Sequence, residues 1–309
     1  MVSFAKGKTQ AGKLIKEIQG NDGLESVGTV SNFEQRLTVA ADFIREHRHD
    51  KSIDLPRDLR SMTKEQAIAY LHYRSETSVD GKFISQSTLN MDRQALEAML
   101  RHTGELDKTS SLPIVRTEAV TMSQSRHYTD IQVTKVLSHQ TSHNALASEL
   151  AYRCGLRAHE LLTLRPLAEQ PPDQRPTKTI SEHKFAGRSG VSYTVIGKGG
   201  LCREIKIPEP LADRLASLRL DTPRFVNDRG IHYHSHYAIA GGNAFSSSFT
   251  RASQRAVGWS AGAHGLRHTY AQQRMAELQE HGLDRDEALL AVSQELGHFR
   301  PDITLVYLR

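Results

Sequence analysis

The sequence is poor in cysteine and in long apolar runs. Its 309 residues include only two cysteines, Cys154 and Cys202, which do not form a Cys-x-x-Cys pair. A disulfide framework is therefore not expected, and a reducing cytoplasm fits the composition. No run of about 18 apolar residues offers a membrane span, and no basic-then-apolar signal segment opens the chain. We therefore expect a cytoplasmic protein that is not associated with a membrane.

Acidic clusters are missing as well. No group of Asp and Glu has the spacing of metal ligands, so phosphate hydrolysis by a two-metal site is poorly supported. The stretch "GIHYHSHYA" places His232, His234 and His236 at i, i+2 and i+4, which would point all three the same way in a strand. No Cys, Asp or Glu of ligand type is adjacent, so we interpret these histidines as polar contacts and predict no metal.

The charge that is present is basic. The chain has 40 Lys and Arg against 35 Asp and Glu, which gives a net charge of +5. Residues 1–125 carry equal numbers of both signs, so the whole excess lies in residues 126–309. A polyanionic partner is therefore permitted, and its contact surface is expected mainly in the second part of the chain.

The length gives room for about two domains. Residues 1–30, with four lysines and a turn-rich "GNDG", predict a basic N-terminal arm. Residues 31–112 contain three amphipathic helical patterns and predict a small helical domain, followed by a Ser/Thr-rich linker at 113–125. Residues 126–309 predict further helices around strands at "TISEHKFAG", "VSYTVIGKGG" and "CREIKIP". The predicted fold is mainly α with a small antiparallel β-sheet.

Four motifs in the second domain place cationic or imidazole side chains at short spacing. They are "CGLRAHELLTL" with Arg157 at the start of a predicted helix and Glu160 as its partner, "IGKGGLCRE" with Lys198 at a hairpin tip, "HGLRHTYA" with His264, Arg267 and His268 on one helical turn, and "LGHFRPDITLVY" with His298 nine positions before Tyr307. Guanidinium groups bind phosphate oxygens bidentately, so the set suits a phosphodiester. Without a metal-activated water, a side chain such as the Tyr307 hydroxyl would be the nucleophile.

In this order, the motifs resemble those of the tyrosine recombinases, the phage-type integrases. The resemblance covers about residues 31–309 and implies a helical core-binding domain that contacts DNA, followed by an α+β catalytic domain. It implies that Arg157 and Arg267 bind the scissile phosphate, that His264 and His298 hydrogen-bond it, and that Tyr307 attacks it to form a 3′-phosphotyrosine. His264 would also be the base, Lys198 the acid for the leaving 5′ oxygen, and Glu160 and His268 supports for these groups. Neither a metal nor another cofactor is implied.

The sequence also departs from the family pattern. An insertion, "EQPPDQRP", lengthens the stretch between Arg157 and Lys198, so Lys184 in "SEHKFAG" is an alternative for the acid. Leu201 stands near the position of the family's second hairpin lysine, and Arg203 would supply the later basic contact. We further predict DNA contacts by Arg74, Lys82, Arg93 and Arg101 in the first domain.

The function expected from the resemblance is site-specific DNA recombination by a homotetramer on double-stranded DNA, in the bacterial nucleoid, with integration or excision of a mobile element as the favoured role. Accessory DNA-bending or directionality factors would fit that role. The alternatives are a chromosome or plasmid resolvase, an enzyme like the type IB topoisomerases, and a non-cutting DNA-binding regulator with the same fold.

Overall fold

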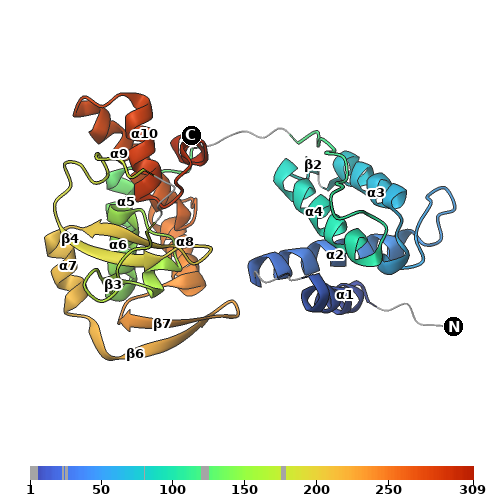
Figure 1. Ribbon diagram of the computed structural model, residues 1–309, viewed down its shortest axis with the longest axis horizontal. Coiled ribbons are helices and arrows are strands. Elements are labelled where there is room, and N and C mark those ends of the chain that lie inside the picture. Colours follow the sequence, from blue (N-terminus) through green and yellow to red (C-terminus); the bar gives the residue numbers. More distant parts are fainter. Residues whose placement is uncertain (1–5, 23, 25–26, 80, 120–124, 175–178) are drawn as a thin grey trace. The chain divides into compact units, whose positions relative to one another are not determined.

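The computed structural model describes residues 6–22, 24, 27–79, 81–119, 125–174 and 179–309. The chain divides into two compact units, Met1–Met122 and Ser123–Arg309, each of which is described by itself (Figure 1). Among the described residues, no helix is long and apolar enough to cross a membrane.

Unit 1 is helical with one short hairpin. Its elements are α1 (Gly7–Asp22), α2 (Val27–His47), the 3-10 helix η1 (Leu59–Ser61), α3 (Lys64–Glu76), strands β1 (Ser78–Val79) and β2 (Lys82–Phe83), and α4 (Gln86–Thr103). Local sequence signals mark the start of α3 and the end of α4. Thr63 caps α3 in a capping box with Gln66, and Gly104 ends α4 in a left-handed conformation with φ +85°.

The N-terminal residues correct the prediction of a separate arm. Residues 7–22 form helix α1, and its side chains Ala11, Leu14, Ile15 and Ile18 are buried in the same core as α2 and α4. These four positions follow helical spacing, so one face of α1 is apolar while its lysines lie elsewhere. The helix is therefore part of unit 1, and residues 1–5 of the predicted arm lie outside the described residues.

Unit 2 is mainly α-helical with two small antiparallel sheets, which confirms the predicted fold class. Its elements are α5 (Asp130–Ser138), α6 (Ser142–Cys154), η2 (Glu160–Leu162), β3 (Arg165–Pro166), β4 (Val191–Ile196), β5 (Cys202–Ile207), α7 (Glu209–Ala216), β6 (Arg219–Asp228), β7 (Ile231–Tyr237), α8 (Gly242–Val257), α9 (His264–Glu280), α10 (Arg285–Glu295), α11 (Pro301–Thr304) and η3 (Leu305–Leu308). One sheet has the order β3-β4-β5, and β6 pairs with β7.

Two local predictions in unit 2 are wrong. Arg157 does not begin an α-helix, because α6 ends at Cys154 and Gly155 closes it with φ +62°, so that Arg157 lies in the turn before η2. A Cβ atom at Gly155 would lie 2.6 Å from the ring of Tyr270, so a side chain there would collide with α9. The segment "TISEHKFAG" forms turns rather than a strand, and residues 175–178 before it lie outside the described residues.

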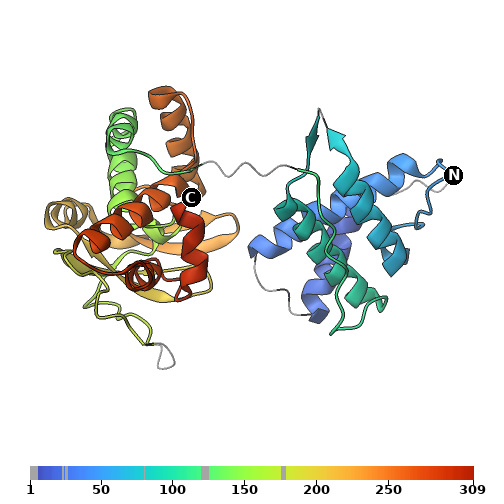
Figure 2. The ribbon, with the colours of Figure 1, turned by 90° about the horizontal axis from the view of Figure 1, so that it is seen from above.

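The core of unit 2 has two parts. The larger lies among α5, α6 and α8 and strands β4 and β5, and includes Cys154 as a small buried residue. Trp259 packs against it, with its ring stacked on Tyr128 at 4.7 Å. The smaller part joins α9 and α10 to Tyr307. The C-terminus accordingly lies beside α9, as both ribbon views show (Figures 1 and 2).

Candidate active site

One buried carboxylate organises the cationic side chains of unit 2. Glu160 is fully buried, and its two oxygens accept hydrogen bonds from the backbone N–H of Arg157 at 2.8 Å and from Arg157 Nη1 at 2.8 Å. Arg203 Nη2 donates to Glu160 Oε2 at 2.8 Å. Burial alone would raise the pKa of Glu160, but the three guanidinium groups around it hold that pKa well below its usual value. Glu160 is therefore a buried anion that holds these cations in place.

Arg267 completes this group from the first turn of α9. It is fully buried, its Nη1 lies 3.8 Å from Glu160 Oε2, and its Nη1 and Nη2 donate to the carbonyl oxygens of Gly155 and Leu296 at 2.5 Å each. Burial lowers the pKa of Arg267 to about 10, so it remains a cation at neutral pH. Three guanidinium groups around one carboxylate leave an excess of two positive charges.

His298 joins the two arginines that the resemblance assigns to phosphate binding. Its Nε2 lies 3.0 Å from Arg157 Nη2 and 3.1 Å from Arg267 Nη2, and its Nδ1 lies 3.2 Å from Thr304 Oγ1. Because both guanidinium groups can only donate, Nε2 is the acceptor and Nδ1 carries the proton. The two Nη2 atoms thus converge on one point, where they could also meet a single anionic oxygen.

Tyr307 lies against the same group although it is close to the chain end. Its side chain is 7% exposed, and its ring centroid lies 5.2 Å from His298, 5.3 Å from His264 and 4.7 Å from His268. The guanidinium carbon of Arg267 lies 5.5 Å from the Tyr307 ring centroid. Gln272 on α9 holds the end of the chain by donating to the carbonyl oxygens of Tyr307 and Arg309 at 3.2 Å. Five of the six predicted catalytic residues, all except Lys198, lie together here.

The three histidines are neutral at physiological pH. Desolvation, followed by the charge of Arg267, lowers the pKa of His264 to about 4 and that of His298 to about 3. Desolvation, followed by the charge of Arg126, lowers the pKa of His268 to about 4, and the Nδ1 of His268 is buried without a hydrogen-bond partner among the described residues. Neutral imidazoles can accept protons, so His264 retains the property that a base requires.

Lys198, the sixth predicted position, lies on the exposed turn between β4 and β5. The turn is closed by the N–H of Gly197 donating to the carbonyl oxygen of Leu201 at 2.7 Å. A Cβ atom at Gly197 would lie 3.5 Å from Glu160 Oε1 and 3.8 Å from Arg157 Nη1, so the base of the hairpin is beside the arginines. The alternative, Lys184, is half-buried with its ammonium 4.9 Å from the ring centroid of Phe185, and burial lowers its pKa. Exposure beside the arginines favours Lys198 for contact with a ligand.

Arg203 corrects the prediction of a DNA contact at that position. Its side chain is 3% exposed, and it donates to Glu160 and to the carbonyl oxygen of Glu295. In unit 1, Arg74 pairs with Asp92, while Arg93 and Arg101 pair with Glu97. Lys82, in β2, is exposed. The DNA contacts of unit 1 stay predictions, and Lys82 is the most accessible of the four.

Three residues near the site were not found from the sequence. Thr304 fixes the ring of His298, and exposed Arg126 is the charge that most affects His268. Glu295 binds Arg274 Nη2 at 2.8 Å and the hydroxyl of Tyr270 at 2.7 Å, which anchors the turn that leads to His298. The sequence signal for Glu295 is its place directly before "LGH"; the other two give no signal.

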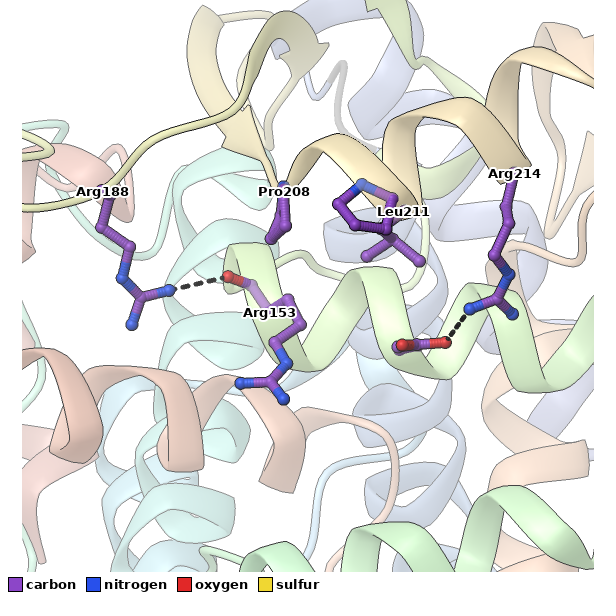
Figure 3. A pocket seen from close by; sticks show the side chains of 7 residues that line it. Arg153, Arg188, Pro208, Leu211 and Arg214 are labelled. Atoms are coloured by element: carbon purple, nitrogen blue, oxygen red, sulfur yellow. Dashed lines mark hydrogen bonds and ion pairs between the residues drawn. The ribbon is translucent and has the colours of Figure 1, made fainter.

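The remaining polar features lie apart from this group. A cavity of about 340 Å³ is lined by three arginines together with Glu149, Pro208, Pro210 and Leu211, and it contains none of the predicted catalytic residues (Figure 3). Two of its arginines are already paired, Arg188 with Glu277 and Arg214 with Glu149. On β7, His232 and His234 pack against the exposed ring of Phe225. Within the described part of the chain, no group of three or more His, Cys, Asp or Glu could hold a metal ion.

Solved structures similar to this chain are tyrosine recombinases and integrases. The XerH site-specific recombinase bound to palindromic difH substrate matches with a TM-score of 0.60 at 16% identity, over 99% of this chain and 82% of its own. The Tn1549 transposon integrase in complex with transposon right end DNA matches with a TM-score of 0.55 at 16% identity, over 97% of this chain and 95% of its own. A lambda integrase tetramer bound to a Holliday junction gives 0.55 at 16% identity, over 97% and 76%.

No protein-family model and no curated protein sequence matches this chain. The similarity to these solved structures is therefore one of three-dimensional structure. The matches cover 97–99% of this chain and so include both units. The chain has the tyrosine recombinase fold.

Proposed function

We propose that this protein is a site-specific DNA recombinase that cleaves and rejoins DNA through a 3′-phosphotyrosyl intermediate. The observation that carries the proposal is that Arg157 Nη2 and Arg267 Nη2 both lie within 3.1 Å of His298 Nε2, beside the ring of Tyr307. Two guanidinium donors aimed at one point suit a phosphate oxygen, and their excess charge would stabilise the more negative transition state.

The chemistry follows from the neighbours of the tyrosine. The Tyr307 oxygen attacks the phosphorus atom while the bond to the 5′ oxygen breaks. Neutral His264 takes the phenolic proton, and Lys198 gives a proton to the departing 5′ oxygen. The number of phosphoester bonds is unchanged, so attack by a different 5′-hydroxyl on the phosphotyrosine rejoins the DNA in a new arrangement.

We further propose that the reaction integrates or excises a mobile element and that a homotetramer carries it out on double-stranded DNA. Two of the three structures compared above are integrases, one from a transposon, and the lambda integrase structure is a tetramer on a Holliday junction. Accessory DNA-bending or directionality factors would act on this assembly. The protein would accordingly be found at the nucleoid of a bacterial cell.

Covalent trapping tests the proposed function. The protein is incubated, without added metal, with nicked suicide duplexes tiled across the DNA that flanks its own gene, and denaturant-resistant protein–DNA adducts are counted. We expect an adduct with the wild type and none with Tyr307→Phe, which keeps the ring but lacks the nucleophile. An adduct in the Phe variant would mean that another residue attacks. DNA binding without an adduct in either protein would favour the non-cutting regulator.

A further inference from the structure

Arg203 has a place in the site that the proposed function does not use. It lies on β5, pairs with Glu160 on one side and with the carbonyl oxygen of Glu295 on the other, and its side chain is 3% exposed. Since it is buried, it cannot contact DNA in this conformation. We propose that Arg203 is a positioning residue for DNA cleavage, which aligns Arg157 through Glu160 and fixes His298 through the turn at Glu295. This inference rests on the proposed function.

One set of contacts links Arg203 to Arg157 through Glu160. Arg203 Nη2 and the backbone N–H of Arg157 both bind Glu160 Oε2 at 2.8 Å, and Arg157 Nη1 binds the other oxygen at 2.8 Å. A carboxylate held from three directions has one orientation, and so has the guanidinium that it binds. Without Arg203, Glu160 could rotate about its last bond, and Arg157 would rotate with it.

A second set of contacts links Arg203 to His298 through the turn at Glu295. Arg203 Nη1 donates to the carbonyl oxygen of Glu295 at 2.5 Å. Gly297 has φ +76°, and a Cβ atom there would lie 2.6 Å from Arg203 Cδ. The backbone of residues 295–297 is therefore folded closely around the Arg203 side chain. This fold places His298 beside the two arginines proposed to bind phosphate.

Stability alone does not explain an arginine at this position. The Nε of Arg203 is buried and lacks a hydrogen-bond partner within the described ranges. A buried donor without a partner is unfavourable, and a methionine of similar length would avoid that cost. What methionine could not do is bind Glu160 and the Glu295 carbonyl oxygen at the same time.

The test compares Arg203→Met and Arg203→Lys with a matched control, Arg214→Met, which removes an exposed arginine that is paired with Glu149 in the same unit. Cleavage is measured in a single turnover on the suicide duplex, and DNA affinity is measured in the Tyr307→Phe background. We expect Arg203→Met to slow cleavage about 100-fold and Arg203→Lys about 10-fold, with affinity changed less than about threefold, since misplacement of reacting groups affects rate more than binding. Arg214→Met should cleave like the wild type.

A second substrate distinguishes positioning from proton donation. A duplex with sulfur in place of the bridging 5′ oxygen has a leaving group that needs no proton. It should restore cleavage to Lys198→Ala but not to Arg203→Met, because Arg203 acts on the groups that hold the phosphate. Restoration of Arg203→Met would overturn the proposal, as would cleavage within about threefold of the wild type on the ordinary duplex.

The role of Arg203 can be tested even if the proposed function fails. If the wild type forms no adduct, recombination is refuted, and Arg203 is then tested in the free protein by the nuclear magnetic resonance signals of the His298 ring. These signals should shift in Arg203→Met and stay in place in Arg214→Met; unchanged signals in both would refute the positioning role. If Arg203→Met does not fold, Arg203→Lys keeps the charge, and both measurements are made on it with the same criteria.

Discussion

Replacement of Glu160 by glutamine should destabilise unit 2 strongly. The substitution keeps the shape of the side chain but removes the one negative charge that the guanidinium groups of Arg157, Arg203 and Arg267 share in a fully buried place. The amide nitrogen of glutamine would also face at least one N–H donor. Breaking a buried ion pair by removing one partner typically costs about 3–5 kcal/mol. We therefore expect the free energy of unfolding to fall by about 4 kcal/mol.

The single tryptophan makes the assay specific for unit 2. Trp259 is the only tryptophan in the chain, and its ring stacks on Tyr128 in the larger core of this unit. Urea unfolding followed by its fluorescence should show a midpoint lowered by about 2 M for Glu160→Gln, if the slope is about 2 kcal/mol per M. Glu149→Gln is the control, because its partner Arg214 is exposed and such pairs contribute less than about 1 kcal/mol.

A shift of less than about 0.5 M in the Glu160 variant would refute the reasoning, since it would mean that the arginines need no buried anion. Added sulfate provides a second check. Without its carboxylate, the cluster carries one more uncompensated positive charge, so sulfate should raise the midpoint of Glu160→Gln more than that of the wild type.

Three further predictions concern other contacts. Gly297→Ala should cost about 1–3 kcal/mol in the same urea assay, because its Cβ would meet Arg203 at a backbone φ of +76°; an unchanged midpoint would show that the turn can relax. Stability of unit 2 should fall by about 4 kcal/mol between pH 7 and pH 5, about 2 kcal/mol for each of His268 and His298, because these side chains, with pKa values of about 4 and 3, bind protons more readily when unfolded; a flat profile would contradict these pKa values. Leu14→Asp should unfold unit 1, as followed by limited proteolysis, whereas exposed Lys16→Asp should not, and equal behaviour of the two variants would support a separate arm instead.

The sequence by itself determined the chemical groups and most of the helices. Local signals do this: Thr63 and Gln66 cap a helix together, and the left-handed Gly104 ends another. The motif order also placed His264, Arg267, His298 and Tyr307 in one site, and the structure brings their side chains together. The apolar face of α1 was present in the sequence too, at Ala11, Leu14, Ile15 and Ile18, but the four lysines and the turn-rich end of this segment are also typical of a basic arm.

Only the tertiary structure decided where α6 ends and what Arg203 does. Gly155 ends α6 because its backbone lies against the ring of Tyr270, which is more than one hundred positions later in the chain. An arginine in a strand is expected to face solvent, since a lone charge is costly to bury. Arg203 is buried because Glu160 and the Glu295 carbonyl oxygen meet it from distant parts of the chain. Sequence patterns report neighbours a few positions away, whereas the burial of a charge depends on partners that only folding brings close.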